Sequence, residues 1–412
     1  MKRTDMIRLS PAAIFCAILA AFAVFEIPVA MRILSTGKPK SIEKRLLEIR
    51  EACARKIPLR MDFVTLNGGV TRLLGQHCCN DSVKMKPGGY LIHPSGSRAD
   101  MTQNVKSAAS FSRWCAKRGI RYLYIMLPKN LDVRQTMLPP GAEDRAYANA
   151  DEFLEKAAAR RVAVRDWRAA FAATPEMVLD NFYRTDHHWN NDASFKATAM
   201  LLDEICAQCD VPPDKATAAR ALLAEDSWTR EIMPACFLGS QGWRTGALFS
   251  GLDDMIVRRP RFKTGNMSIH IPSENVRRTG TFEETAMWRA GELKEPGRGI
   301  KEKGAYSLLY TGGLYPQIQH ANQDAPIDRR VLLIGDSYLR PVEAFLSVAV
   351  KKVDVVDLRR CDRRFRLSRH VKETKPDIVI QILAPSSLTS DTIGIRKIGR
   401  AAMFDYGLSN GK

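Results

Sequence analysis

Two short stretches of this 412-residue sequence carry side chains that could do chemistry together. The first is TDHHWN (185–190), in which two of the chain's seven histidines stand side by side between an acid and a tryptophan. The second is LLIGDSY (332–338), which contains Ser337. A serine nucleophile needs a base, and a histidine oriented by an acid can supply it. The two stretches together therefore predict acyl transfer through a serine.

The spacing within TDHHWN assigns a role to each polar residue. In an extended segment, residues i and i+2 point to the same side, so Asp186 can hold His188 while His187 points away. An aspartate that accepts from Nδ1 leaves Nε2 of His188 free to take the serine proton. Residues 190–192 offer caps for a helix that begins there. We therefore expect the motif at a loop-to-helix junction, with Trp189 packed against the domain.

A metal site and a solvated turn are the alternative interpretations of TDHHWN. A metal site would use His187 and His188 with Asp186 or Asp192. Adjacent histidines seldom converge on one ion, and the sequence contains neither an HExxH motif nor a pair of CxxC motifs. We therefore favour the catalytic interpretation and expect neither a metal nor a cofactor.

The position of Ser337 suits a nucleophile. It follows the apolar run VLLI (331–334) and precedes a helix-forming segment. This arrangement brings backbone N–H groups and the positive end of a helix close to the hydroxyl, as the oxyanion of acyl transfer requires. Gly-Asp-Ser is also simply a good turn sequence, and we expect Asp336 to secure the turn. Asn130 and Arg244 are candidates for further oxyanion donors, and both could equally be structural or surface residues.

The N-terminus predicts export. Lys2, Arg3 and Arg8 precede an apolar run over 11–31 that is interrupted at Glu26. About 20 apolar residues can span a membrane, and positive charge before them keeps the N-terminus in the cytoplasm. We expect an uncleaved anchor followed by a periplasmic or extracellular domain, and a cleaved signal peptide is the alternative.

Composition narrows the class of protein further. The chain is 45% hydrophobic, which excludes a disordered or fibrous protein, and its net charge is +18. That charge would suit an anionic polymer, a membrane surface or nucleic acid, and export argues against nucleic acid. Of the nine cysteines, Cys16 lies in the apolar run, and the other eight could form disulfides in an oxidising compartment. The CxxC of Cys206 and Cys209 is a weak zinc or redox signal, so we expect these cysteines to be buried or disulfide-bonded.

Helical and strand patterns alternate along the chain, which implies an α/β fold with a parallel sheet covered on both faces. Residues 213–330 break this rhythm, and we interpret them as a long insertion with a β-hairpin around 239–254. The expected elements are helix 104–118, strand 121–127, helix 149–161, strand 162–167, strand 331–334, helix 341–352, strand 353–358, helix 363–375 and strand 376–384.

These motifs resemble the DHHW family of SGNH-hydrolase-like proteins, similar to the periplasmic alginate O-acetylation proteins. The resemblance covers most of residues 60–395. It implies an SGNH-like, flavodoxin-like sheet with a circularly permuted triad order, in which Ser337 is the nucleophile, His188 the base and Asp186 the orienting acid. The matching segments are GGYLI (88–92), the strand and PKN (121–130), TDHHWN, LGSQGWRTG (238–246), IGDSY and VVDLR (355–359).

The resemblance and the export signal together predict an extracytoplasmic O-acetyltransferase that acts on a cell-surface or exported polysaccharide. The expected partners are a membrane acyl-transfer protein that supplies the acetyl donor and a polysaccharide acceptor, and not nucleic acid. An acetylesterase of the same fold and a catalytically silent polysaccharide-binding protein are the alternatives. The expected segments are a cytoplasmic N-terminus (1–9), a membrane anchor (10–34), a stalk (35–60), a catalytic domain (61–395) and a C-terminal tail (396–412).

Overall fold

A computed structural model describes residues 60–287, 306–389 and 402–408, apart from residues 81, 96 and 363, and a few single residues between 24 and 49. The segments 1–9 and 10–34, and all of 35–60 except its last residue, lie outside these ranges apart from those few residues. Within the described ranges, no helix is both long and apolar enough to cross a membrane. The predicted anchor is therefore not tested by the structure.

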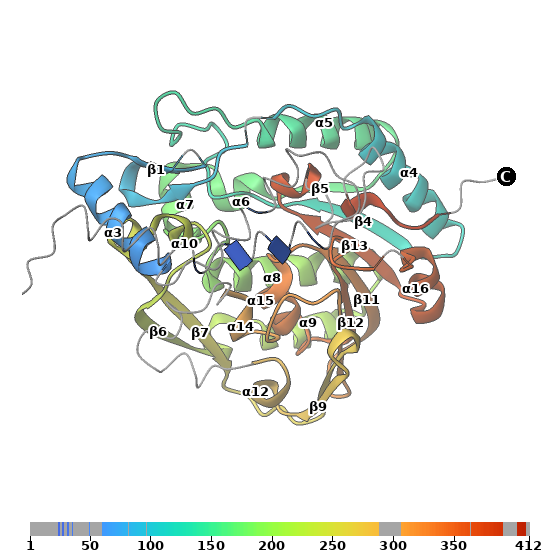
Figure 1. The fold of residues 1–412 in the computed structure, drawn as a ribbon. Helices are drawn as coiled ribbons and strands as arrows, with labels where there is room; N and C mark the ends of the chain where they lie inside the picture. The colour runs from blue at the N-terminus through green and yellow to red at the C-terminus, as the bar shows by residue number, and fades with distance from the viewer. Residues whose placement is uncertain are drawn as a thin grey trace, which may run out of the picture.

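An eight-stranded sheet forms the centre of the fold, in the order β5-β4-β13-β11-β12-β10-β8-β9 (Figure 1). The first five strands in that order are parallel, as the alternating pattern predicts. Their bounds are β5 Val164–Asp166, β4 Arg121–Met126, β13 Ile378–Leu383, β11 Ile327–Gly335 and β12 Val350–Val356.

The other edge of the sheet is antiparallel, so the expectation of a parallel sheet holds for only part of it. All three strands there come from the segment interpreted as an insertion, and two of them, β8 and β10, alternate between buried and half-buried residues. Such alternation marks a sheet with one face open to water, which antiparallel strands tolerate and buried parallel strands do not. Their bounds are β8 Met267–Ile271, β9 Val276–Gly280 and β10 Gln317–Asn322.

Helices cover both faces of the parallel strands (Figure 1). Along β11, Val331 and Leu333 pack into one core cluster, and Leu332 and Ile334 pack into the other. Successive strand residues point to opposite faces, so the apolar run VLLI buries both sides. The first cluster includes α8 (Asn191–Gln208), α9 (Pro213–Leu222) and α15 (Leu339–Leu346), and the second includes α4 (Thr102–Ala116), α5 (Ala146–Ala159) and α16 (Leu367–Thr374).

Several expected elements have different bounds in the structure, among them the helix over 341–352 and the strand over 353–358. The helix expected over 341–352 ends at Leu346, and β12 already begins at Val350. The sequence VAVKKVDVV is rich in β-branched valines, which favour a strand over a helix. The C-terminal residues 402–408, part of the expected tail, pack into the second core cluster through Met403, Phe404 and Tyr406.

The strands of the hairpin expected around 239–254 lie mostly on either side of that range in the sequence. Its strands are β6 (Trp228–Phe237) and β7 (Asp253–Pro260), and the residues between them form the short helices α10 (Gly242–Thr245) and α11 (Ala247–Ser250). Gly246 has a positive φ of 83° and separates these two helical turns. The remaining elements are α3 (Arg60–Leu73), β1 (Cys78–Asn80), β2 (Val83–Met85), β3 (Leu91–Ile92), α6 (Arg168–Ala172), α7 (Pro175–Asn181), α12 (Phe282–Thr285) and α14 (Tyr306–Leu309).

The cysteines form no disulfide within the described ranges. Cys206 and Cys209 are buried at the end of α8. Of the two states expected for the CxxC motif, buried or disulfide-bonded, the structure shows the first. Cys115 is also buried, and burial raises the pKa of its thiol to about 12. These thiols behave as small apolar side chains of the core rather than as reactive groups.

Candidate active site

Ser337 lies in the turn between the carboxyl end of β11 and the start of α15. The turn is tight, because a Cβ atom at Gly335 would collide with the Leu339 side chain. Asp336 fixes the turn, as expected from the sequence. Its Oδ1 accepts from the Tyr338 backbone N–H at 3.1 Å, and its Oδ2 accepts from the Ala384 N–H at 3.0 Å. The nucleophile turn is thereby fastened to the end of β13.

The TDHHWN loop reaches Ser337 from the start of α8. Asn190 caps this helix by accepting from the Ala193 N–H at 2.9 Å, which confirms the expected loop-to-helix junction. Trp189 is buried, and its indole Nε1 donates to the Tyr338 carbonyl at 3.2 Å. Trp189 therefore packs against the domain, as expected, and it also binds the turn that carries Ser337 through a hydrogen bond.

The three residues singled out by their spacing come together in one chain of short hydrogen bonds. His188 Nε2 lies 2.6 Å from Ser337 Oγ, and His188 Nδ1 lies 2.6 Å from Asp186 Oδ1. The His188 backbone N–H also donates to Asp186 Oδ1 at 3.0 Å. A carboxylate at Nδ1 places the ring proton there, so Nε2 is left to accept the proton of the serine hydroxyl.

The electrostatics favour an ionised Asp186. Burial by itself raises the pKa of this carboxyl group, but two other effects outweigh burial. The neighbouring imidazoles lower the pKa, and so do the hydrogen bonds from His188 and from the Ser240 backbone N–H, the latter 2.6 Å long. The pKa of Asp186 therefore lies well below its ordinary value, and the carboxylate stays charged beside the imidazole.

Residues that the sequence analysis did not assign hold this loop in place. Asp253, at the start of β7, accepts from the Arg184 N–H at 2.9 Å and from the Thr185 N–H at 2.8 Å. The Thr185 hydroxyl also donates to Asp253, at 2.5 Å. The acid is buried, and burial raises its pKa. No local pattern connects Asp253 with Thr185, because 68 residues separate them.

The LGSQGWRTG segment supports Asp186 from the other side. The Gln241 and Gly242 N–H groups donate to the Thr185 carbonyl at 3.1 and 2.9 Å. A Cβ atom at Gly239 would collide with Asp186, so only glycine allows this approach. The three glycines of the segment were a signal for such a close approach, although they did not identify Asp186 as the neighbour.

Two tyrosines enclose His188. Tyr306, the first residue of α14, stacks on the imidazole with ring centroids 4.0 Å apart and an interplanar angle of 6°. Tyr338 lies on another side, with its ring centroid 5.0 Å from that of His188, and its hydroxyl donates to the His187 carbonyl. The rings restrict the rotation of the imidazole, which keeps Nε2 directed at Ser337. The sequence analysis missed Tyr306.

The two side chains considered as oxyanion donors are placed differently. The Asn130 side-chain amide donates to the Leu91 carbonyl at 2.8 Å and to the Asp186 carbonyl at 3.3 Å. Both of its N–H groups are thus used to hold β3 and the loop together. Arg244 is exposed on α10. Among the described residues, the backbone N–H of Ser337 has no hydrogen-bond acceptor, and it remains available to an oxyanion.

Asp186, His187 and His188 also place potential metal ligands within 4.8 Å of one another. Both ring nitrogens of His188 are already hydrogen-bonded, one to the acid and one to the serine. His187 Nδ1 lies 2.8 Å from Ser240 Oγ, and its side chain is 41% exposed. These contacts favour the acid–base interpretation of the cluster over the metal interpretation.

The fold and this geometry define an α/β protein with a serine, a histidine and an aspartate at the carboxyl edge of its sheet. The histidine is hydrogen-bonded to both of the other side chains. Residues 88–230 match the family model described as SGNH hydrolase-like domain, acetyltransferase AlgX. Residues 88–230 are therefore similar to an AlgX-like SGNH hydrolase-like domain, and the resemblance predicted from the motifs is confirmed.

Solved structures share the fold at low sequence identity. PatB1 of Bacillus cereus is 19% identical with a TM-score of 0.60, over 77% of this chain and 100% of PatB1. The structure of PatB1 with a sulfonyl adduct has 18% sequence identity and a TM-score of 0.59, and the match covers 76% of this chain and 100% of PatB1. A DHHW family protein from Eubacterium siraeum has 16% sequence identity and a TM-score of 0.50, and the match covers 74% of this chain and 90% of that protein's chain. A comparison with curated protein sequences found no significant match.

Proposed function

We propose that this protein is an O-acetyltransferase that carries the acetyl group on Ser337. The observation on which the proposal rests is the pair of 2.6 Å contacts that join Asp186, His188 and Ser337 through opposite nitrogens of one imidazole. A solvated turn or a metal site would not require this order of atoms. The match to a family model described as an acetyltransferase supports transfer over hydrolysis.

In the first half-reaction, Ser337 Oγ attacks the carbonyl carbon of an acetyl donor while His188 Nε2 takes the hydroxyl proton. Asp186 stabilises the imidazolium that forms, because its carboxylate stays ionised beside Nδ1. The Ser337 backbone N–H can donate to the oxyanion of the tetrahedral intermediate. Collapse of this intermediate expels the donor's leaving group, which takes the proton from His188, and leaves acetyl-Ser337.

In the second half-reaction, a sugar hydroxyl replaces the leaving group. His188 Nε2 takes the proton of the acceptor hydroxyl as its oxygen attacks acetyl-Ser337. Collapse returns that proton to Ser337 Oγ and releases the acetylated sugar. Water in the place of the sugar would make the same residues an acetylesterase, so the acceptor that reaches acetyl-Ser337 decides between the two activities.

The location and partners of the reaction belong to the same proposal. The apolar run over 11–31 with basic residues before it supports a membrane-anchored protein whose domain faces the periplasm or the exterior. An acetyl donor delivered by a membrane acyl-transfer protein and a polysaccharide acceptor would suit that location. Nucleic acid is not proposed as a partner.

The test follows the fate of the acetyl group in the full-length protein. An activated acetyl ester is supplied with and without oligosaccharides, and ester cleavage and acetylated sugar are measured together. We expect acetylated sugar to form with the wild type and not with Ser337→Ala. Ser337-dependent cleavage that releases acetate alone, whatever sugar is supplied, would identify an esterase. Equal results for wild type and Ser337→Ala would indicate a binding protein.

A further inference from the structure

Two adjacent hollows lie along the exposed side of α4. One, of about 390 Å³, lies between α4 and the end of α5, and the other, of about 310 Å³, lies between α4 and α16. They share Ser110 and Arg113, so they form one continuous depression. We name it the basic groove after the cations that line it, Lys106, Arg113, Lys117, Arg160, Arg161 and Lys372.

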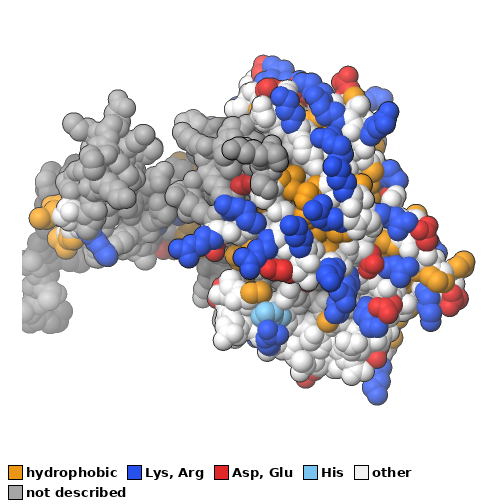
Figure 2. Space-filling model, turned by 90° about the vertical axis from the view of Figure 1, so that its right-hand side faces the viewer, with side chains coloured by type: hydrophobic (Ala, Val, Ile, Leu, Met, Phe, Trp, Pro, Cys, Tyr) orange, Lys and Arg blue, Asp and Glu red, His pale blue; other side chains and the backbone are white. Residues whose placement is uncertain are grey.

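All the charged side chains that line the basic groove are cations, although Lys106 also acts electrostatically on Asp100, which is outside the lining. No aspartate or glutamate lines either hollow, and none of the six cations has an ion-pair partner in the part of the chain that the structure describes. Some exposed cations elsewhere are paired, such as Arg220 with Asp203 at 2.7 Å and Arg165 with Glu204 at 2.6 Å. Figure 2 shows Lys and Arg side chains gathered on the side of the molecule where α4 and α16 lie in Figure 1.

The spacing of the cations suits an extended ligand. Lys106 and Arg113 lie seven residues apart on one face of α4, and Lys117, four residues further on, is the cap residue at the end of that helix. At 1.5 Å per residue they span about 16 Å along the helix. A single small anion would neutralise only part of this row. A chain that repeats its negative charges would neutralise all of it.

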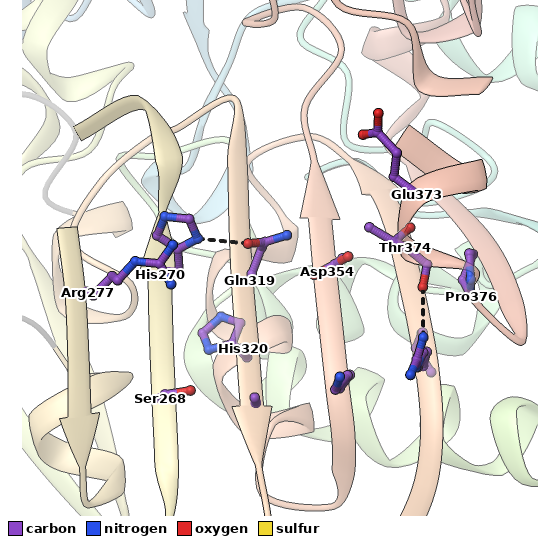
Figure 3. Close-up of a pocket in the computed structure, with 13 residues that line it drawn as sticks. Ser268, His270, Arg277, Gln319, His320, Asp354, Glu373, Thr374 and Pro376 are labelled. Carbon is purple, nitrogen blue, oxygen red and sulfur yellow. Dashed lines mark hydrogen bonds between the residues drawn. The ribbon is translucent and has the colours of Figure 1, made fainter. Parts of the chain in front are cut away.

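A third hollow has a different character. It measures about 350 Å³ and lies on the open face of β8, β10 and β12, beside the end of α16 (Figure 3). His270 Nδ1 lies 2.8 Å from the Gln319 side-chain oxygen, and Asp354 and Glu373 line the hollow together with Arg277. Acids and cations are mixed there, so its charge does not define one class of ligand.

We propose that the basic groove binds a stretch of polysaccharide that carries carboxylates or phosphates. The identity of this ligand as the acetyl acceptor rests on the proposed function. The groove contains none of the hydrogen-bonded residues at Ser337, and its helices cover the face of the sheet opposite to α8 and α15. It therefore holds the polymer away from the nucleophile and raises the concentration of acceptor hydroxyls near the protein.

The test measures binding by the full chain at low and high salt. The probes are a polyuronate oligosaccharide, a sugar-phosphate oligomer, a neutral glucan oligosaccharide of the same length and phosphatidylglycerol vesicles. The groove variant is Lys106→Gln/Arg113→Gln/Lys372→Gln. The matched control is Arg165→Gln/Arg220→Gln/Lys351→Gln, which removes as much charge from exposed or half-buried cations that have ion-pair partners.

We expect at least one anionic oligosaccharide to bind the wild type in a salt-sensitive manner, and the groove variant to bind it about tenfold more weakly. The control should stay within about twofold of the wild type. The proposal would be overturned if the neutral glucan bound as tightly as the anionic oligosaccharides, or if the control variant lost as much affinity as the groove variant. It would also be overturned if the vesicles were the only probe whose binding depended on the groove. If acetyl transfer fails while groove-dependent binding persists, the proposed function is wrong and the ligand class of the groove stands.

Discussion

The Trp189 indole N–H donates to the Tyr338 backbone carbonyl at 3.2 Å, and these two residues directly follow the proposed base and the proposed nucleophile. This hydrogen bond joins the loop that carries His188 to the turn that carries Ser337, in addition to the contact between the two side chains themselves. The distance between base and nucleophile then depends on one buried hydrogen bond as well as on the packing of two separate segments.

The Trp189→Phe substitution tests this connection. It keeps an aromatic ring beside Phe171 and removes the donor, so we expect a loss of about 1 kcal/mol in the free energy of unfolding. Slight misplacement of the base should lower kcat about tenfold with little change in KM. Trp228→Phe is the control, because its indole donates to the Leu222 carbonyl at 2.7 Å, outside the site. Equal losses of kcat in both variants would refute the positioning role.

Gly239→Ala tests the close approach of the LGSQGWRTG segment to Asp186. The added Cβ would collide with the aspartate, so we expect a loss of about 1–3 kcal/mol of stability and a fall in kcat of more than about tenfold. Gly265→Ala is the matched control, because a Cβ there has open space and the change should stay within about 0.5 kcal/mol. Urea unfolding and ester turnover measure both quantities. A Gly239→Ala protein with wild-type kcat would remove this contact from the account.

Asp186 should contribute a pH-dependent part of the stability. Its pKa in the folded protein is depressed, whereas a free aspartate titrates near about 4. The contribution is therefore fully present above that pH and is lost as the pH falls toward the folded value. We expect Asp186→Asn to weaken the fall in unfolding free energy below about pH 4 and to lower kcat by a factor on the order of ten thousand. Identical acid unfolding of the two proteins would contradict the assignment.

Glu343 should produce the opposite dependence. It is fully buried on α15, where burial raises its pKa to about 7 although Arg340, whose Nη1 donates to it at 2.9 Å, acts to lower it. Between about pH 4.3 and the folded value, the folded protein retains a proton that the unfolded chain has released. The contribution of Glu343 to the free energy of unfolding should therefore fall with rising pH, by at most about 1.4 kcal/mol per unit.

Urea unfolding between pH 5 and 7 measures this slope. Glu343→Gln should remove this contribution and shift the slope to a more positive value than in the wild type, because the amide can still accept from Arg340 but does not titrate. Glu373→Gln is the control, because Glu373 lies exposed on α16 and pairs with Arg369 there. A slope that is unchanged in Glu343→Gln but shifted in Glu373→Gln would contradict the assignment of this titration to Glu343.

Local patterns predicted the elements that carry the chemistry. The strand at 121–127, the helix after TDHHWN and the turn at Ser337 were found because apolar periodicity and caps act over a few residues. The i and i+2 relation between Asp186 and His188 was also local. It correctly paired Asp186 with His188, but the expectation that His187 points away was wrong, because His187 Nδ1 lies 3.2 Å from the same Asp186 Oδ1.

The missed features depend on contacts between distant segments. The antiparallel edge was read as a break in the pattern, because β8 and β10 bury only one face and their order in the sheet is not encoded locally. Asp253 was not assigned from the sequence, because only the fold buries it beside Thr185. Tyr306 reaches His188 from 118 positions later in the sequence, and no short-range pattern marks it.

The most direct measurement is the mass of the Ser337 peptide after the full chain has reacted with an activated acetyl ester and been quenched in acid. We predict an acetyl group on Ser337 in the wild type, none in Ser337→Ala, and strongly reduced labelling in His188→Ala. An added acceptor oligosaccharide should discharge the label faster than water does. An unlabelled Ser337 peptide in the wild type, or equal acetylation of the wild type and Ser337→Ala at other residues, would contradict the acyl-enzyme.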